Sequence, residues 1–83
     1  MSEQVFVNLC KKEVVEHTNK VLGEKIEEKD VFVVWLCKVL QNNKALLSTT
    51  LLDGMYYEIT HNGNDGVLYV GAYKKTDNYT VVV

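Results

Sequence analysis

The sequence predicts an α+β domain in two layers, with an N-terminal amphipathic helix packed on a four- to five-stranded antiparallel β-meander. Two observations predict this fold class. Apolar residues recur at helical spacing over the first quarter of the chain, and β-branched and aromatic stretches separated by turn formers fill most of the remainder. At 83 residues the chain has room for one small core, so we expect a single domain over residues 1–83.

Residues 3–22 have the pattern of an amphipathic helix. Ser2 can cap free N–H groups at its start, and Glu3 then lies at the positive end of the helix dipole. Gly23 suits the position that follows a last helical turn. At about 100° per residue, one face collects most of the apolar side chains. These residues are Phe6, Val7, Cys10, Val14, His17 and Val21.

Residues 31–83 have the pattern of a β-meander. Gln41-Asn42-Asn43 predicts the first hairpin, Asp53-Gly54 predicts a two-residue hairpin, and Asn62–Gly66 predicts the third turn. Beyond these strands the apolar tail Tyr79–Val83 is either a fifth strand or a segment that docks on a partner.

The first strand, residues 31–40, carries more apolar surface than one helix can cover. In a regular strand Phe32, Val34 and Leu36 share one face, and the residues between them share the other. With the helix on one side, either the sheet curls on itself or a second molecule covers the surplus face. A symmetric homodimer is the commonest solution. We therefore predict Phe32, Val34 and Leu36 as a dimer or protein-interaction face.

Tyrosines are concentrated in the last strands. Tyr56, Tyr57, Tyr69 and Tyr73 form a candidate surface for an aromatic ligand or a partner, because aromatic side chains anchor interfaces and stack on bases. The more common use of such residues is cross-strand packing that stabilises an antiparallel sheet.

No catalytic constellation is visible, so we expect a protein that is not an enzyme. Cys10 and His17 share a helix face but are seven residues apart, about 10 Å along the axis, which is too far for a hydrogen bond. Glu13 and His17 could form half of a metal site, but nothing in the sheet completes it. We expect His17 to pack at the edge of the core and His61 to be solvated in a turn. No catalytic residue, metal or cofactor is predicted.

Composition narrows the partners and the location. The net charge of −2 argues against nucleic acid, which requires a basic surface. Two cysteines are too few for a disulfide framework and indicate a reduced, cytoplasmic protein. No stretch approaches the ~18 apolar residues that would predict a membrane span.

Residues 31–75 resemble a group of small proteins of unknown function that are encoded by phages and prophages of Gram-positive bacteria. The resemblance implies a phage-borne accessory protein of the bacterial cytoplasm, and it transfers no catalytic residue. Asn43 and His61 depart from the pattern, in which an aromatic residue often stands at both positions. The segments that carry the resemblance are Val34-Trp35-Leu36-Cys37-Lys38, Leu40-Gln41-Asn42, Lys44-Ala45-Leu46-Leu47-Ser48-Thr49-Thr50, Asp53-Gly54-Met55-Tyr56-Tyr57-Glu58-Ile59-Thr60, Asn62-Gly63 and Ala72-Tyr73-Lys74-Lys75.

Three functions compete. The leading one is a non-enzymatic protein that contacts an unidentified host or phage protein, either to modulate or inhibit a host factor or defence system or to assist a phage complex. The second is a small-molecule or nucleotide binder that sequesters its ligand in a tyrosine-rich pocket of a dimer. The third and weakest is a nucleic-acid binder, whose binding should fall steeply with salt.

Overall fold

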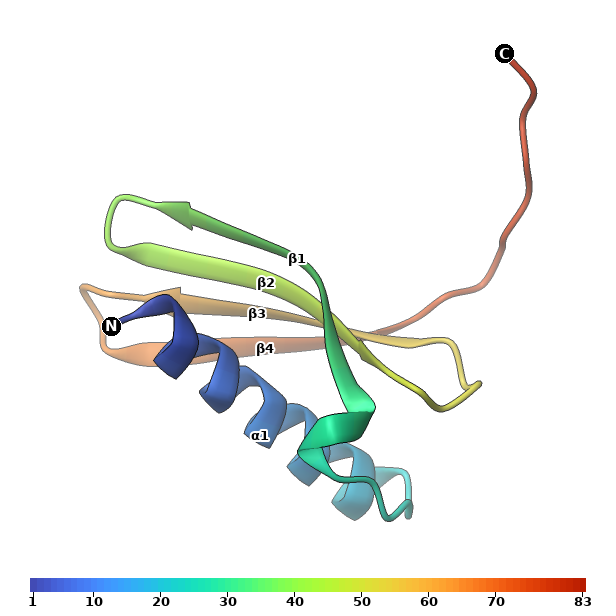
Figure 1. Cartoon of the computed structure of the whole chain (residues 1–83), viewed down its shortest axis with the longest axis horizontal. Coiled ribbons are helices and arrows are strands. Elements are labelled where there is room, and N and C mark those ends of the chain that lie inside the picture. Colours follow the sequence, from blue (N-terminus) through green and yellow to red (C-terminus); the bar gives the residue numbers. More distant parts are fainter.

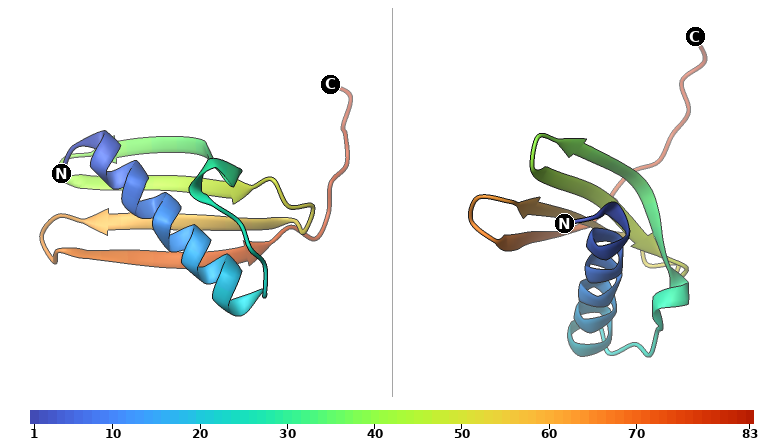
Figure 2. Two further views of the ribbon diagram at one scale, coloured as in Figure 1. Left: turned by 60° about the horizontal axis from the view of Figure 1, so that its bottom comes forward. Right: turned by 60° about the vertical axis from the view of Figure 1, so that its left-hand side comes forward.

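The computed structural model describes residues 1–83 and contains one long helix, one short 3-10 helix and four strands. The strands form a single antiparallel sheet in the order β1-β2-β3-β4, and the long helix lies across one face of it (Figures 1 and 2). The predicted α+β meander is confirmed with four strands, and the sheet is open rather than curled on itself. The elements are α1 (Glu3–Val21), η1 (Glu28–Asp30), β1 (Val31–Val39), β2 (Asn42–Thr49), β3 (Met55–Asn62) and β4 (Val67–Lys74).

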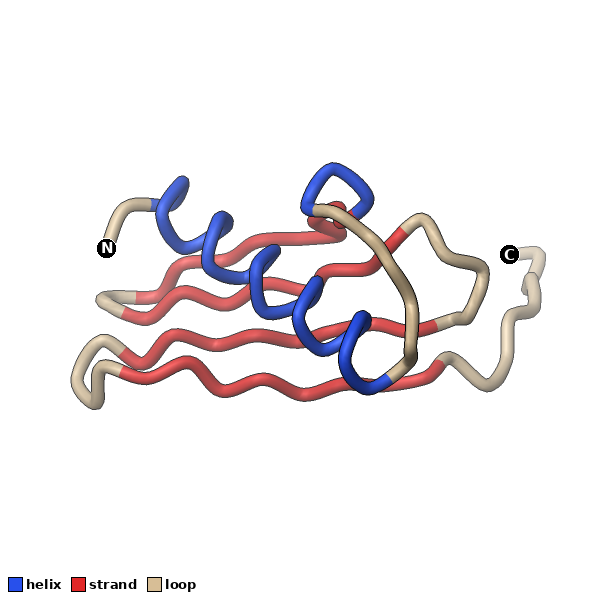
Figure 3. The backbone as a smooth tube through the Cα atoms, turned by 90° about the horizontal axis from the view of Figure 1, so that it is seen from below, coloured by secondary structure: helices blue, strands red, loops and turns tan.

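Helix α1 begins and ends close to where the sequence predicts. The Ser2 hydroxyl accepts a hydrogen bond from the Val5 N–H at 3.2 Å, and Gly23 follows the helix with φ of 71°. The buried face differs at the C-terminal end, where Thr18 is buried and Val21 is exposed. The helix crosses the sheet diagonally and its last turn reaches the β4 edge (Figure 3), so little sheet lies there to cover Val21.

The core lies between α1 and the sheet. Thr18 on the helix and Tyr57 on β3 are both fully buried and share a hydrogen bond of 3.2 Å between their hydroxyl groups. Each hydroxyl therefore has a partner in a place that water does not reach. The apolar core residues are Phe6, Cys10, Val14, Ile26, Val31, Ala45, Leu47, Tyr57 and Ile59.

A β-bulge at Val34 overturns one prediction about strand β1. Val33 pairs with Leu47 and Trp35 pairs with Leu46, so Val34 is an extra residue in the ladder. The extra residue reverses the alternation of side chains beyond it. Leu36 therefore packs against the core. The prediction that Leu36 shares a face with Phe32 is wrong.

Two of the three predicted turns differ in length. The first hairpin turns at Leu40 and Gln41, one residue earlier than expected, and Leu40 has φ of 57°. Strand β2 ends at Thr49, so the next connection has five residues rather than two. The Thr50 N–H donates a hydrogen bond to the Asp30 carbonyl, next to the Val31–Thr49 pair, so contact with the β1 side continues one residue past the end of β2. The third turn, between Asn62 and Val67, is confirmed.

The turn at Gly63 lies directly against the first hairpin turn. A Cβ atom at Gly63 would lie 2.6 Å from the Gln41 carbonyl oxygen, so only glycine fits this approach. The Gln41 side chain donates to Asn64 Oδ1 at 2.8 Å, and the Gly63 N–H donates to Asn42 Oδ1 at 3.2 Å. These contacts hold the two hairpins side by side.

The tail after β4 forms no fifth strand. Residues 75–83 have no helix or strand, and Tyr79–Val83 is exposed. The tail leaves the end of β4 on the side of the sheet opposite α1 (Figure 1).

Candidate functional site

The sheet has one face that no other element covers, which we call the open face. Residues paired across an antiparallel ladder point to the same side, and neighbours along a strand point to opposite sides. Because Leu47, Tyr57 and Ile59 are buried under α1, the residues that alternate with them face outward. The open face consists of Phe32, Trp35 and Cys37 on β1, Lys44, Leu46 and Ser48 on β2, Tyr56, Glu58 and Thr60 on β3, and Tyr69, Gly71 and Tyr73 on β4.

The β1–β2 side of the open face is mainly apolar. Phe32 is 47% exposed and Trp35 is 41% exposed, and Leu46 lies beside Trp35 as its cross-strand partner. We call Phe32, Trp35 and Leu46 the apolar half. Val34, in the bulge, is also exposed. Phe32 and Val34 of the predicted interaction face are therefore exposed to solvent, whereas Leu36 is partly buried and packs against the core.

The β3–β4 side carries three of the four predicted tyrosines. Tyr56 pairs with Tyr73 across the ladder, and Tyr69 pairs with Thr60. Tyr57 is fully buried on the opposite face, so its prediction as part of a ligand or partner surface is wrong. The Lys75 ammonium lies 5.3 Å from the centre of the Tyr56 ring, close enough for a cation–π contact.

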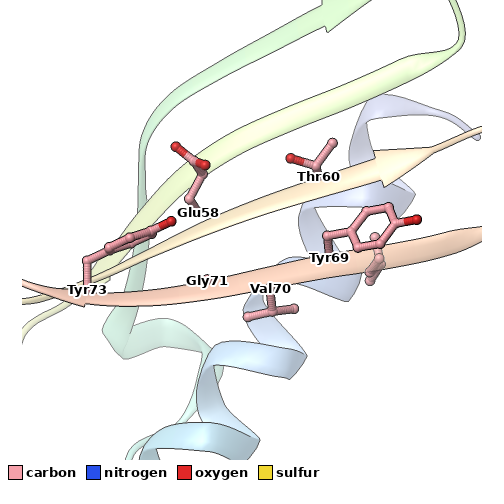
Figure 4. Close-up of a pocket in the computed structure, with 7 residues that line it drawn as sticks. Glu58, Thr60, Tyr69, Val70, Gly71 and Tyr73 are labelled. Atoms are coloured by element: carbon pink, nitrogen blue, oxygen red, sulfur yellow. The ribbon is translucent and has the colours of Figure 1, made fainter.

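A groove of about 410 Å³ runs between Tyr69 and Tyr73. Figure 4 shows both rings on the same side of the sheet as Glu58 and Thr60, while Val70 points to the other side. A Cβ atom at Gly71 would lie 2.9 Å from Cε2 of Tyr73, so the Tyr73 ring occupies space that a side chain would otherwise fill. The residues that line the groove are Glu58, Thr60, Leu68, Tyr69, Val70, Gly71 and Tyr73.

One carboxylate lines this groove and a second lies beside the Tyr69 hydroxyl. Glu58 Oε1 lies 3.5 Å from the Lys44 ammonium, and both side chains are more than a third exposed. An exposed pair of this kind contributes less than about 1 kcal/mol. At the other end, the Tyr69 hydroxyl donates to Asp65 Oδ2 at 3.3 Å. The groove is therefore aromatic on two sides, with the ion-paired Glu58 carboxylate in its lining and the Asp65 carboxylate beside the Tyr69 hydroxyl.

The two histidines have different surroundings. The His17 ring packs edge-on against Tyr57, with ring centroids 5.3 Å apart, which confirms a packed position at the core edge. His61 is half-buried on β3 rather than solvated in a turn, and its Nδ1 atom is buried without a hydrogen-bond partner. On the ladder it pairs with Asn43, so the two positions that depart from the resemblance are neighbours.

The thiols and acidic residues offer little chemistry. Burial, and to a lesser extent the nearby Glu13 carboxylate, raise the pKa of the Cys10 thiol to about 12. Cys10 is thus protonated at neutral pH and a poor nucleophile. Cys37 is exposed on the open face. No three His, Cys, Asp or Glu residues lie together in a way that could hold a metal ion.

The fold and this surface define a small α+β protein with one sheet face covered by a helix and the other open. The chain belongs to the family of unknown function DUF6275, whose model matches residues 7–83. The match thus extends beyond the β-meander to most of α1 and to the tail. Neither the curated proteins nor the solved structures contain a match. No helix of this protein combines the length and apolar character needed to cross a membrane.

Several residues of the open face were not predicted from the sequence. Trp35 was not predicted on this face, because the bulge decides which side of β1 faces outward. Leu46 and Glu58 were not predicted either, and their outward positions follow from the regular β2–β3 ladder. One signal was available for the tyrosines. Tyr56 and Tyr57 are adjacent in a strand, so they cannot share a face.

Proposed function

We propose that this protein is a non-enzymatic binding module that acts by protein–protein contact through its open face. The observation that supports the proposal best is the exposure of Phe32 and Trp35 on a sheet face without a second layer. Large aromatic side chains are enriched at the centres of interfaces, where their burial contributes most of the binding energy.

The context we propose is that of a phage or prophage accessory protein in the cytoplasm of a Gram-positive host. The resemblance over residues 31–75 supports this context. In it, the partner is a host factor or a phage protein, and contact with the open face modulates or inhibits that partner.

We further propose that a second copy of the chain pairs through the apolar half, as a reversible homodimer. Two strands of eight to nine residues, at about 3.3 Å per residue and 4.8 Å between strands, give the apolar half an area of roughly 250–300 Å² in each copy. A pair that meets through this half would thus bury roughly 500–600 Å², below the usual range of stable complexes. This area favours a dimer that forms and dissociates readily.

The nucleotide-binding alternative has less support. The groove between the tyrosines is lined by Glu58 and by no Lys or Arg, and Asp65 lies at the hydroxyl of Tyr69. Carboxylates at this position would repel a phosphate group. A nucleic-acid ligand would meet the same repulsion over a longer stretch of backbone.

The test uses an open-face variant and a matched control. Trp35→Lys places a charge in the apolar half, and Val5→Lys places the same charge on an exposed apolar position of α1. Light scattering over ~10–500 μM should show a dimer for the natural chain and for Val5→Lys, and a monomer for Trp35→Lys. Binding of a partner protein to the natural chain should be abolished by Trp35→Lys and retained by Val5→Lys. Equal binding and equal mass for both variants would overturn the proposal.

A further inference from the structure

We infer that the groove between Tyr69 and Tyr73 receives an arginine side chain of a partner protein. The inference rests on the proposed function, because it specifies the chemistry of a residue on the contacting protein. It concerns the β3–β4 side of the open face, away from the apolar half.

Tyr69 and Tyr73 present aromatic ring surface on both sides of the groove. Tyr69 and Tyr73 flank Gly71 on β4, and both side chains are more than half exposed. Figure 4 shows the Tyr73 ring lying over Gly71 and directed toward Glu58 on the neighbouring strand. Since a Cβ atom at Gly71 would come within 2.9 Å of this ring, glycine is what permits the arrangement. The exposed ring surface attracts cations through its quadrupole.

One carboxylate lines the groove and a second lies beside it. Glu58 is the cross-strand partner of Gly71, so its carboxylate lies beside the position over which the Tyr73 ring rests. Its Oε1 atom faces Lys44 at 3.5 Å, which leaves Oε2 available to a further donor. Asp65 adds a second carboxylate, which accepts a hydrogen bond from the Tyr69 hydroxyl. Aromatic surface next to carboxylates is complementary to a cation and unfavourable for a phosphate.

Arginine fits this groove better than lysine does. A guanidinium group is planar, stacks on an aromatic ring and can donate two hydrogen bonds to one carboxylate. It is also hydrated more weakly than an ammonium group, so it is more easily transferred from water to an aromatic surface. The Thr60 hydroxyl, also in the groove, can accept a further donor of the fork.

Removing the charge of Lys44 and removing the charge of Glu58 should have opposite effects on the binding of an arginine side chain. The Lys44 ammonium group already neutralises part of the Glu58 charge and competes with an incoming cation. Removing the Lys44 charge should therefore strengthen binding, while removing the Glu58 charge should weaken it. A surface that binds nonspecifically through apolar contact would respond to neither change.

The experiment is a titration of the full-length ¹⁵N-labelled chain, followed by NMR, with N-acetyl-L-arginine methylamide. We expect saturable shifts of the Gly71 and Thr60 amides, and none with N-acetyl-L-citrulline methylamide, which has nearly the same shape without the charge. Loss of one cation–π contact at an exposed site weakens binding by roughly 2–5-fold, which is the change expected for Tyr73→Leu. Glu58→Gln should weaken binding and Lys44→Gln should strengthen it, each by roughly 2–5-fold. Val5→Lys should bind like the natural chain.

Equal shifts with the arginine and citrulline probes would overturn the inference, as would weaker binding by Lys44→Gln. Binding of AMP at the same amides would also overturn it, because that result would indicate a phosphate ligand. The amide resonances of residues outside the groove report whether each variant is folded. Tyr73→Phe keeps the aromatic ring, so it should retain most of the binding. If the dimer dissociates with Trp35→Lys while the groove variants bind nothing, the proposed function stands and this inference fails. If the groove binds arginine while Trp35→Lys and Val5→Lys show the same mass and the same partner binding, the proposed function fails and the arginine site stands.

Discussion

The hydrogen bond between Thr18 and Tyr57 should make a measurable contribution to the stability of the packing of α1 on the sheet. The two hydroxyl groups are 3.2 Å apart, and both residues are fully buried. Tyr57→Phe removes one hydroxyl and leaves the other in an apolar place without this partner. Such a loss costs about 1–2 kcal/mol, which for a domain of this size lowers the Tm by roughly 4–16 °C.

A double-mutant cycle separates the bond from other effects of the substitutions. Thr18→Val should cost about as much as Tyr57→Phe, since it leaves the tyrosine hydroxyl without its partner. In the double variant both partners are apolar, so the total loss should be about 1 kcal/mol smaller than the sum of the single losses. Tyr56→Phe is the matched control, because it removes a hydroxyl on the other face of the same strand and should change stability by less than about 0.5 kcal/mol.

Urea denaturation followed by Trp35 fluorescence and by far-ultraviolet circular dichroism measures these differences. Agreement between the two probes would show that helix and sheet unfold together. The predicted contribution is refuted if the losses in unfolding free energy of the two single variants add within about 0.3 kcal/mol. It is also refuted if Tyr57→Phe destabilises the protein no more than Tyr56→Phe. Either result would mean that apolar packing alone holds the helix on the sheet.

Three other predictions concern stability. Leu36→Ala should cost about 1–2 kcal/mol and Val34→Ala less than about 0.5 in urea denaturation, because the bulge turns only Leu36 to the core; equal losses would contradict the bulge. Burial and Glu13 raise the pKa of Cys10 from 9.0 to about 12, so the unfolded chain loses the thiol proton first. The stability due to this shift is fully present below pH 9 and is lost between pH 9 and pH 12, by up to about 1.4 kcal/mol of unfolding free energy per pH unit. In urea denaturation at several pH values, Cys10→Ala should show a smaller decline over this range. Leu40→Gly should raise the Tm, because Leu40 has φ of 57°; a lower Tm would show that the conformation is not strained.

Helix α1 could be predicted closely because several independent signals agree. The apolar spacing, the Ser2 cap and Gly23 all place its ends within a residue of where they lie. The prediction of its buried face was less accurate, since the diagonal crossing leaves Val21 exposed at the β4 edge and buries Thr18 instead. Spacing along a helix does not specify the angle at which it crosses a sheet.

The bulge and the first turn could not be predicted for a physical reason. Val33 and Val34 are both apolar and β-branched, so neither is marked as the extra residue in the ladder. Leu40 is no turn former, yet it takes the left-handed conformation because the ladder pairs Val39 with Asn42. Both features depend on the pairing of two strands, whereas sequence periodicity describes one strand at a time.

The character of the open face argues for contact that is made and broken. An obligate interface resembles a domain core and would enclose the Lys44–Glu58 pair away from water. Two charges in such a place carry a desolvation cost that a pair 3.5 Å apart recovers only in part. Half-exposed aromatic rings beside an ion pair are better suited to a surface that is solvated when the protein is free. On binding, the Lys44–Glu58 contact can be exchanged for a contact with a charged group of the partner. On this reasoning, replacing Lys44 and Glu58 together by leucine should convert a weak association into a tight one. Unchanged light scattering for that double variant would indicate that the pair does not limit association.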